Sequence, residues 1–237
     1  MTIKDRIRAG WRRRLITHSV QNVGNGLPTM PTTIRAGDLA VIAAFAEDNT
    51  TTPPASSTPI GWTLQGTTTV VRAADAARAE YYTKILDGTE GGTTYTIVNR
   101  DYETALFMVF RPVYARIASA TALGLGMDFQ KSGAGLSTQT VSLAAVSHHY
   151  IAGGIIMGGL SSTSTDLTAE GSFVASPAPG ADFLIRDDND TTANTIRYTN
   201  AGLWEGRYRP TNIQAGIGDV LSDFQQATAW AIGIDLK

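Results

Sequence analysis

The feature of this sequence that most constrains its fold is a succession of short apolar runs, each bounded by Thr, Gly, Pro or Asn. Clear examples are residues 39–46, 105–110 and 230–236. Apolar runs of about four to eight residues between turn residues are typical of β-strands, whereas an amphipathic helix needs a longer pattern of 3.6-residue period. The 24 glycines and the low charged fraction of 17% also favour turns and strands. We therefore predict an all-β fold, an antiparallel β-sandwich with a jelly-roll or immunoglobulin-like order of strands.

The predicted strands follow these runs along the whole chain. They cover residues 15–23, 39–46, 61–64, 80–85, 94–98, 105–110, 120–129, 138–146, 150–160, 183–186, 195–204 and 230–236.

Five segments carry more specific predictions. Residues 39–46 are continuously apolar, which predicts a central strand covered on both faces. Residues 80–85 alternate and predict a half-buried strand, while residues 70–78 are interpreted as a loop in preference to a helical turn. Residues 120–129 and 138–146 are candidates to pair with each other.

The glycine-rich segment at residues 150–160 needs a separate explanation. Its four glycines would weaken a strand unless another backbone or large side chains lie close against it. We predict such a close approach.

Two pairs of segments inside the chain resemble each other weakly. Residues 104–110 resemble 228–234 at an offset of 124, and residues 38–42 resemble 149–153 at an offset of 111. Unequal offsets favour two sheets of similar style over a true repeat. We predict one β-sandwich domain over residues 15–237, with a division into two domains as the alternative.

The charges are divided unevenly between the N-terminus and the rest of the chain. Residues 1–14 hold six cations and one carboxylate, a net charge of +5, whereas the remainder holds 13 cations and 20 carboxylates, a net charge of −7. A basic arm on an acidic body indicates that the arm contacts something that the body does not. Binding to nucleic acid would be nonspecific and salt-sensitive, so docking onto a neighbouring subunit is the preferred interpretation.

The predicted assembly arm has both cationic and apolar members. Ile3, Ile7 and Trp11 lie four residues apart and would line one face of a short helix. An isolated helix this short is marginal, and a solvated tail is an equal alternative. The residues that we expect to carry attachment are Lys4, Arg6, Ile7, Arg8, Trp11, Arg12, Arg13 and Arg14.

The chain has few cysteine and histidine residues that could act in catalysis or bind a metal. The chain has no cysteine and three histidines, of which His148 and His149 are adjacent, so on a strand they would point to opposite faces. No nucleophile elbow, zinc-binding helix motif or phosphate loop is present. We therefore expect no enzyme activity and no cofactor.

Carboxylate clusters give an equally weak signal for a metal or for acid–base chemistry. Residues 187–190 are the best cation candidate, but Asp and Asn clustered in this way favour a turn between strands. Two carboxylate pairs, Asp87 with Glu90 and Asp101 with Glu103, are not positioned by any pattern that would suit glycoside hydrolysis. We predict no metal site and interpret residues 187–190 as a turn.

One aromatic and arginine cluster is a candidate recognition surface. It consists of Trp204, Arg207, Tyr208 and Arg209. Exposed aromatic rings next to arginine would stack on a carbohydrate, but the same residue types form ordinary protein–protein contacts. Both interpretations stay open.

The order of several short motifs resembles a known family. These motifs are residues 37–45, the Pro53-Pro54 loop, residues 61–64, residues 79–84 with 94–97, and residues 106–111. Together they resemble a β-sandwich family found in tailed-bacteriophage virion proteins, especially minor tail and fibre-type components. The resemblance covers residues 37–160.

The resemblance implies a non-enzymatic virion structural protein, part of the tail tip, baseplate or fibre, that acts in assembly or host attachment. A capsid decoration protein and a carbohydrate-binding module are the alternatives. The expected partners are other virion proteins, further copies of the same chain and a host surface glycan. No run of eighteen apolar residues and no signal peptide is present, so we expect synthesis in a host cytoplasm, location in the virion and no membrane partner.

Overall fold

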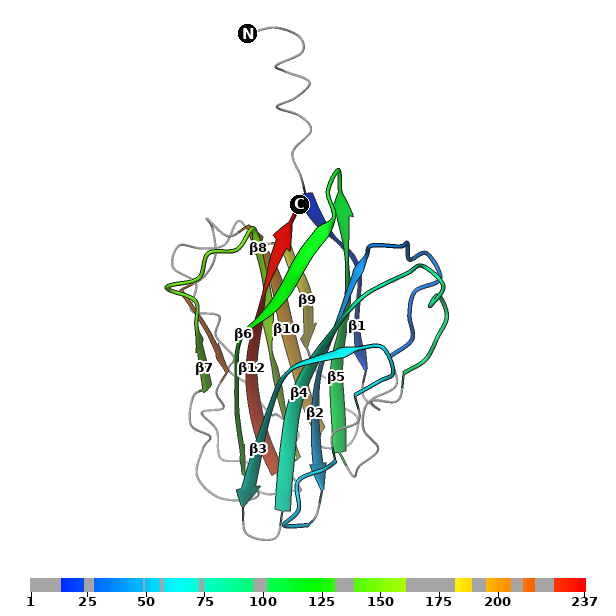
Figure 1. Cartoon of the computed structure of the whole chain (residues 1–237). Coiled ribbons are helices and arrows are strands. Elements are labelled where there is room, and N and C mark those ends of the chain that lie inside the picture. Colours follow the sequence, from blue (N-terminus) through cyan, green and yellow to red (C-terminus); the bar gives the residue numbers. More distant parts are fainter. Residues whose placement is uncertain are drawn as a thin grey trace, which may run out of the picture.

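The structure is a computed structural model, and it describes residues 14–23, 28–48, 50–55, 58–72, 75–95, 102–130, 139–160, 182–188, 195–205, 211–215 and 224–237. All regular structure in these residues is β-strand (Figure 1). The strands are β1 (Arg14–Val23), β2 (Leu39–Asp48), β3 (Thr63–Arg72), β4 (Asp75–Ile85), β5 (Tyr102–Val113), β6 (Ile117–Gln130), β7 (Gln139–Ser142), β8 (Tyr150–Leu160), β9 (Asp182–Asp188), β10 (Thr195–Glu205), β11 (Asn212–Ala215) and β12 (Phe224–Leu236).

Two five-stranded antiparallel sheets pack face to face, which confirms the predicted β-sandwich. The first sheet has the order β1-β5-β2-β4-β3 and the second has the order β6-β12-β8-β10-β9. A separate two-stranded sheet, β11-β7, lies outside the second. The chain completes one five-stranded sheet before it begins the other, so the strand order is that of neither a jelly roll nor an immunoglobulin domain, in which the chain crosses between sheets.

The core fills the space between the two sheets. The first sheet contributes inward residues from four strands, including Leu39, Leu106 and Tyr81, and the second contributes Trp230 and Ile234 among others. Tyr81 and Trp230 meet across the interface with ring centroids 6.2 Å apart. Burial raises the pKa of the Tyr81 phenol to about 12. The alternation of apolar residues in β12 predicts one apolar face, and this is confirmed because residues 230, 232, 234 and 236 all face this core.

The outer face of each sheet is covered as well. Residues 28–38 and 86–95 lie over the first sheet, where Met30, Trp62 and Leu86 pack on the outward side chains of β2 and β5. The β7–β11 ribbon covers the second sheet in the same way. This double cover explains why β2 is buried along nearly its whole length, as its continuous apolar sequence predicts. It also makes β4 buried on both faces, so the prediction of a half-buried strand there is wrong.

The two sheets have the same topology. Numbered along its own half of the chain, with β7 and β11 set aside, each sheet has the order 1-5-2-4-3. The equivalent pairs are β1 with β6, β2 with β8, β3 with β9, β4 with β10 and β5 with β12. At the edges of the sandwich β3 lies against β6 and β1 lies against β9, which are equivalent contacts under a two-fold axis. Because β5 and β12 both run to the same end of the molecule (Figure 1), this axis runs along the strands.

The register of β2 with β4 and β5 repeats residue by residue in β8 with β10 and β12, whereas the irregularities of β1–β5 and β6–β12 fall at different positions. Leu39 pairs with Phe110 in the first sheet, and Tyr150 pairs with Ile234 in the second. The weak sequence similarities therefore fall on equivalent strands, and the prediction of two merely similar sheets is wrong. The offset grows from 111 at β2/β8 to 124 at β5/β12 because the second half has the longer connections.

An irregularity of the first sheet also recurs in the second. Gln65 is left out of the β3–β4 pairing between Leu64 and Gly66, and Leu184 is left out of the β9–β10 pairing between Phe183 and Ile185. These bulges lie 119 residues apart, between strands whose neighbours correspond at offsets of 119 and 120. A shared bulge is conserved geometry of a kind that sequence similarity this weak does not reveal.

Three further predictions are settled by the strands. Residues 70–72 and 75–78 belong to β3 and β4, so the predicted loop is wrong. Strand β6 pairs with β12, and β7 pairs with β11, so residues 120–129 and 138–146 do not pair with each other. In β8 the close approach is confirmed at Gly153, where an added Cβ would lie 2.5 Å from Ile213 Cδ1 and 2.8 Å from the Trp230 carbonyl oxygen.

Candidate functional site

One end of the sandwich collects the features that bear on function. Strand β1 begins there at Arg14, the last residue of the predicted arm, and β2, β6 and β8 also begin there, while β5 and β12 end there (Figure 1). We call it the arm-bearing end. Since the two-fold axis runs along the strands, equivalent positions of both sheets meet at this end.

A buried ion pair holds the first sheet together at the arm-bearing end. Asp38, 1% exposed, accepts hydrogen bonds from Arg111 Nε at 3.0 Å and Arg111 Nη2 at 2.7 Å, and from the Arg35 backbone N–H at 2.8 Å. Arg111 also donates to the Thr33 carbonyl. This bidentate geometry raises the pKa of the Arg111 guanidinium. We call the pair the first latch, because it joins the start of β2 to the end of β5.

A tight turn presents the carboxylate of the first latch. The Asp38 N–H donates to the Arg35 carbonyl, which closes a four-residue turn. Gly37 occupies the third position with φ +90°, a backbone conformation that glycine adopts without strain. Gly37 also donates its N–H to the Leu86 carbonyl, so the turn is fixed to the end of β4.

The equivalent positions of the second sheet hold a second latch, in which the carboxylate comes from the last strand of the sheet. Asp235 of β12 is equivalent to Arg111, and His149 is equivalent to Asp38. The Asp235 carboxylate lies 2.8 Å from His148 Nδ1 and 3.0 Å from His149 Nδ1. Both histidines precede β8 in a loop, so they reach one carboxylate, and the prediction that they point to opposite faces is wrong.

The second latch depends on a glycine. The His148 ring lies on Gly233, where an added Cβ would be 2.3 Å from its Cδ2. Partial burial alone would raise the pKa of Asp235, but the hydrogen bonds from His148 and His149 outweigh it, and the pKa lies below its ordinary value. Both latches tie a strand start to a strand end, which is a structural role.

The cations without a counter-charge gather at the arm-bearing end. Outside β9 and β10, eight cationic side chains lie in the described part of the chain, and four of them have carboxylate partners: Arg72 with Asp128, Arg78 with Glu80, Lys84 with Glu90 and Arg111 with Asp38. The other four are Arg14, Arg35, Arg116 and Lys237, and within the described residues none of them forms an ion pair. All four lie at this end, where the chain arrives from the cationic residues 1–13.

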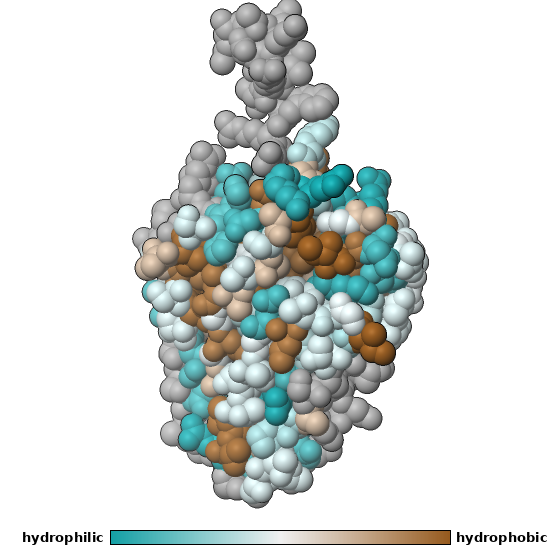
Figure 2. All heavy atoms as spheres, viewed as in Figure 1, coloured by the Kyte–Doolittle hydropathy of each residue, from teal (hydrophilic) through white to brown (hydrophobic). Residues whose placement is uncertain are grey.

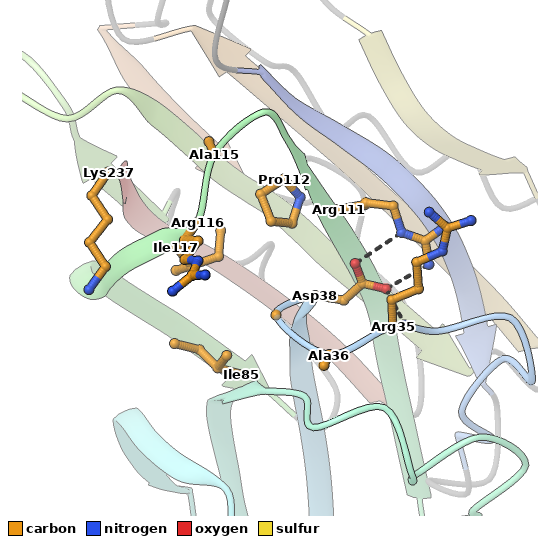
Figure 3. A pocket seen from close by; sticks show the side chains of 11 residues that line it. Arg35, Ala36, Asp38, Ile85, Arg111, Pro112, Ala115, Arg116, Ile117 and Lys237 are labelled. Atoms are coloured by element: carbon orange, nitrogen blue, oxygen red, sulfur yellow. Dashed lines mark hydrogen bonds and ion pairs between the residues drawn. The ribbon is translucent and has the colours of Figure 1, made fainter.

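A pocket of about 560 Å³ lies among these cations, between the two sheets (Figure 3). Arg35 stands beside the first latch on one side, and Arg116 and Lys237 stand together on the other. Backbone hydrogen bonds in both directions, 3.0 and 2.9 Å long, hold Arg116 and Lys237 side by side. The apolar lining is Ile85, Pro112, Ala115 and Ile117. Hydrophilic and apolar side chains likewise adjoin at this end of the surface in Figure 2.

The structure describes two of the predicted site residues, Arg14 and Trp204, and they differ in exposure. Arg14 is exposed at the start of β1, and the other arm residues lie outside the described part. Trp204 is 1% exposed and packs beneath the β7–β11 ribbon with Ile151 and Ile213, so the prediction that it belongs to a recognition surface is wrong. Arg207, Tyr208 and Arg209 lie outside the described residues.

The carboxylate candidates have structural roles where the structure describes them. Glu90 is buried and accepts bonds from the Asp87 and Gly88 backbone N–H groups and from Lys84, so it holds the turn after β4. Asp187 and Asp188 end β9 instead of forming a turn, and residues 101, 189 and 190 lie outside the described part. The described residues contain no group of three metal-binding side chains.

Sequence reasoning missed the pocket and both latches. The pocket cations are spread over residues 35, 116 and 237 and have no common motif. The only usable signal was the pair of weak internal similarities, which would have aligned position 38 with 149 and position 111 with 235. Comparisons of the chain found no matching protein family, no matching curated protein and no matching solved structure. Among the described residues there is no helix of the length and hydropathy that a membrane span requires.

Proposed function

We propose that the chain is a non-enzymatic structural protein of a tailed-bacteriophage virion, a component of the tail tip, baseplate or fibre that acts in assembly or host attachment. It is attached to a neighbouring virion protein through its arm-bearing end. The motif resemblance at residues 37–160 supports the location in a virion. The distribution of charge supports attachment through the arm-bearing end.

The observation that carries the proposal is the segregation of charge. Outside β9 and β10, every described cation away from the arm-bearing end has a carboxylate partner, whereas the four without one lie where a further five cations of residues 1–13 join the sandwich. Arrangements of one sign of charge steer association with a surface of the opposite sign. The described histidine and carboxylate clusters hold turns and strand ends, which also favours a structural role over a catalytic one.

The test of the virion setting is immunogold electron microscopy on purified phage particles from the source of the gene, with antibody raised against the whole chain. Label at the distal tail supports the proposal. Label over the head would favour the alternative of a capsid decoration protein, and particles without label would contradict a virion role.

The attachment mode is tested by the mass of the whole chain in solution from light scattering. The comparison is with a full-length variant in which Arg6, Arg8, Arg12 and Arg13 are replaced by Gln. If the arm mediates self-assembly, the unaltered chain is a defined oligomer and the variant is smaller. Equal masses would contradict self-assembly through the arm and leave a different virion protein as the partner.

A second candidate function, glycan binding, is favoured by a different observation. An open pocket of about 560 Å³ is lined by the Tyr95 ring, the Lys84–Glu90 ion pair and several threonine hydroxyls. Aromatic faces and paired polar groups are the chemistry that recognises sugar rings and hydroxyls. A glycan array probed with the whole chain tests it: selective binding that Tyr95→Ala abolishes supports a glycan site, and uniform background binding contradicts it.

A further inference from the structure

We propose that the pocket at the arm-bearing end binds an acidic peptide segment of a neighbouring protein. Two of the segment's carboxylates would meet the cations on either side of the pocket, and an apolar side chain between them would lie on the apolar lining. This inference deepens the proposed function and rests on it only for the identity of the neighbour. The pocket chemistry is independent of that identity.

The electrostatics of the pocket favour an anion. Its lining side chains include four cations and one carboxylate, and that carboxylate, Asp38, is already bound to Arg111 at 2.7 Å. No carboxylate side chain of the described residues forms an ion pair with Arg35, Arg116 or Lys237. Concave sites lined by one sign of charge focus the field and raise the local concentration of the opposite sign.

The shapes of these cations favour carboxylates in particular. An arginine guanidinium presents paired N–H donors that match the two oxygens of a carboxylate, and a lysine ammonium adds a point charge. Because Arg35 and the Arg116–Lys237 pair stand on opposite sides of the pocket (Figure 3), a ligand that satisfies both carries two separated anionic groups. A segment with alternate acidic residues has this form.

The apolar lining separates a peptide from a simple anion. Ile85 is 51% exposed, and it faces the space between the two groups of cations with Pro112 and Ile117. A phosphate ion or a phosphodiester backbone would leave this surface in water. An aliphatic side chain would remove this surface from water, which favours binding.

The experiment is an NMR titration of the whole chain with the peptide Ac-Glu-Leu-Glu-Leu-Glu-NH2 at about 50 mM salt, where screening is weaker than at physiological ionic strength. We expect saturable shifts of the Ile85 and Ile117 methyl groups and of the Arg116 side-chain Nε–H. Arg116→Gln and Lys237→Gln should each weaken binding about three- to tenfold, the range for one charge-assisted contact at a partly exposed site.

The matched control is Arg72→Gln, which removes the same charge from the opposite end of the first sheet and should leave the affinity unchanged. The same spectra report whether each variant is folded. Equal binding of the uncharged peptide Ac-Gln-Leu-Gln-Leu-Gln-NH2 would overturn the proposal. Displacement of the acidic peptide by an equal concentration of inorganic phosphate, at matched ionic strength, would also overturn the proposal. Absence of shifts at the pocket would refute it while leaving the virion assignment to the microscopy.

Discussion

The replacement Arg111→Met tests the first latch most directly. Asp38 is 1% exposed and takes two of its three hydrogen bonds from Arg111, so the variant leaves a buried carboxylate with only the Arg35 N–H. Breaking a buried pair from one side costs about 3–5 kcal/mol of unfolding free energy. At about 2–4 °C per kcal/mol for a chain of this size, a loss of 4 kcal/mol lowers the melting temperature by about 8–16 °C.

The assay is urea unfolding followed by the fluorescence of the four tryptophans, with the denaturant slope checked for constancy. Arg72→Met is the comparison, because the Arg72 side chain is 56% exposed and its buried partner Asp128 keeps the hydrogen bond from the Phe129 N–H, so this half-exposed pair should contribute less than the first latch. In the double variant Asp38→Asn/Arg111→Met the two losses should fall short of additivity by about 1–3 kcal/mol. A loss for Arg111→Met no larger than that for Arg72→Met would refute the account of the latch.

Three further predictions concern the second sheet. The pKa of Asp235 in the folded chain lies below its ordinary value of 3.8, so its contribution to stability is present above pH 3.8 and is lost as the pH falls through the folded pKa. Asp235→Asn should therefore flatten the acid side of a stability-versus-pH curve measured by urea unfolding. An unchanged acid side would contradict this prediction. Gly233→Ala places a Cβ against the His148 ring and should cost about 1–3 kcal/mol in thermal unfolding, a loss that His148→Ala should partly rescue; no rescue would mean that the clash is not with His148. Trp204→Ala leaves a cavity at a buried site and should lower the free energy of unfolding by about 3–5 kcal/mol. Loss of glycan binding by this variant would therefore report unfolding. A melting temperature equal to that of the unaltered chain would contradict the burial of Trp204.

Local sequence patterns predict this fold well where burial is simple. The continuous apolar run at residues 39–46 and the alternation at residues 230–236 each identify their strand and its environment, because β2 has cover on both faces and β12 presents residues 230, 232, 234 and 236 to the inner core. The prediction fails at residues 70–78, where Val, Arg, Ala and Asp give no clear period. Residues 70–72 pair with residues 75–77 in a hairpin, and residues 76–78 also pair with β2, which is distant in the sequence.

The candidate site is harder to predict because its members share no local pattern. Trp204 is attractive as a surface aromatic only while the β7–β11 ribbon that covers it is unknown. His148 and His149 are assigned opposite faces only on the premise of a strand, and the chain reaches β8 one residue later. In both cases the error concerns tertiary neighbours, which composition and periodicity do not encode.

The repeated topology explains why both latches and the cations without ion pairs lie at the same end of the sandwich. A two-fold axis along the strands places both latches at one end, so each sheet fixes the start of its second strand to the end of its last strand there. The carboxylate precedes the second strand in one latch, Asp38 with Arg111, and lies on the last strand in the other, Asp235 with His149. What the two sheets share is therefore the position of the latch and not the identity of its charges. An end fixed twice by such contacts is a rigid base, and rigidity lowers the ordering cost of binding at that place. The cations that the latches leave unpaired, Arg35 and Arg116 among them, are thus held beside these two fixed points. That is where a site for a partner's carboxylates gains most from preorganisation.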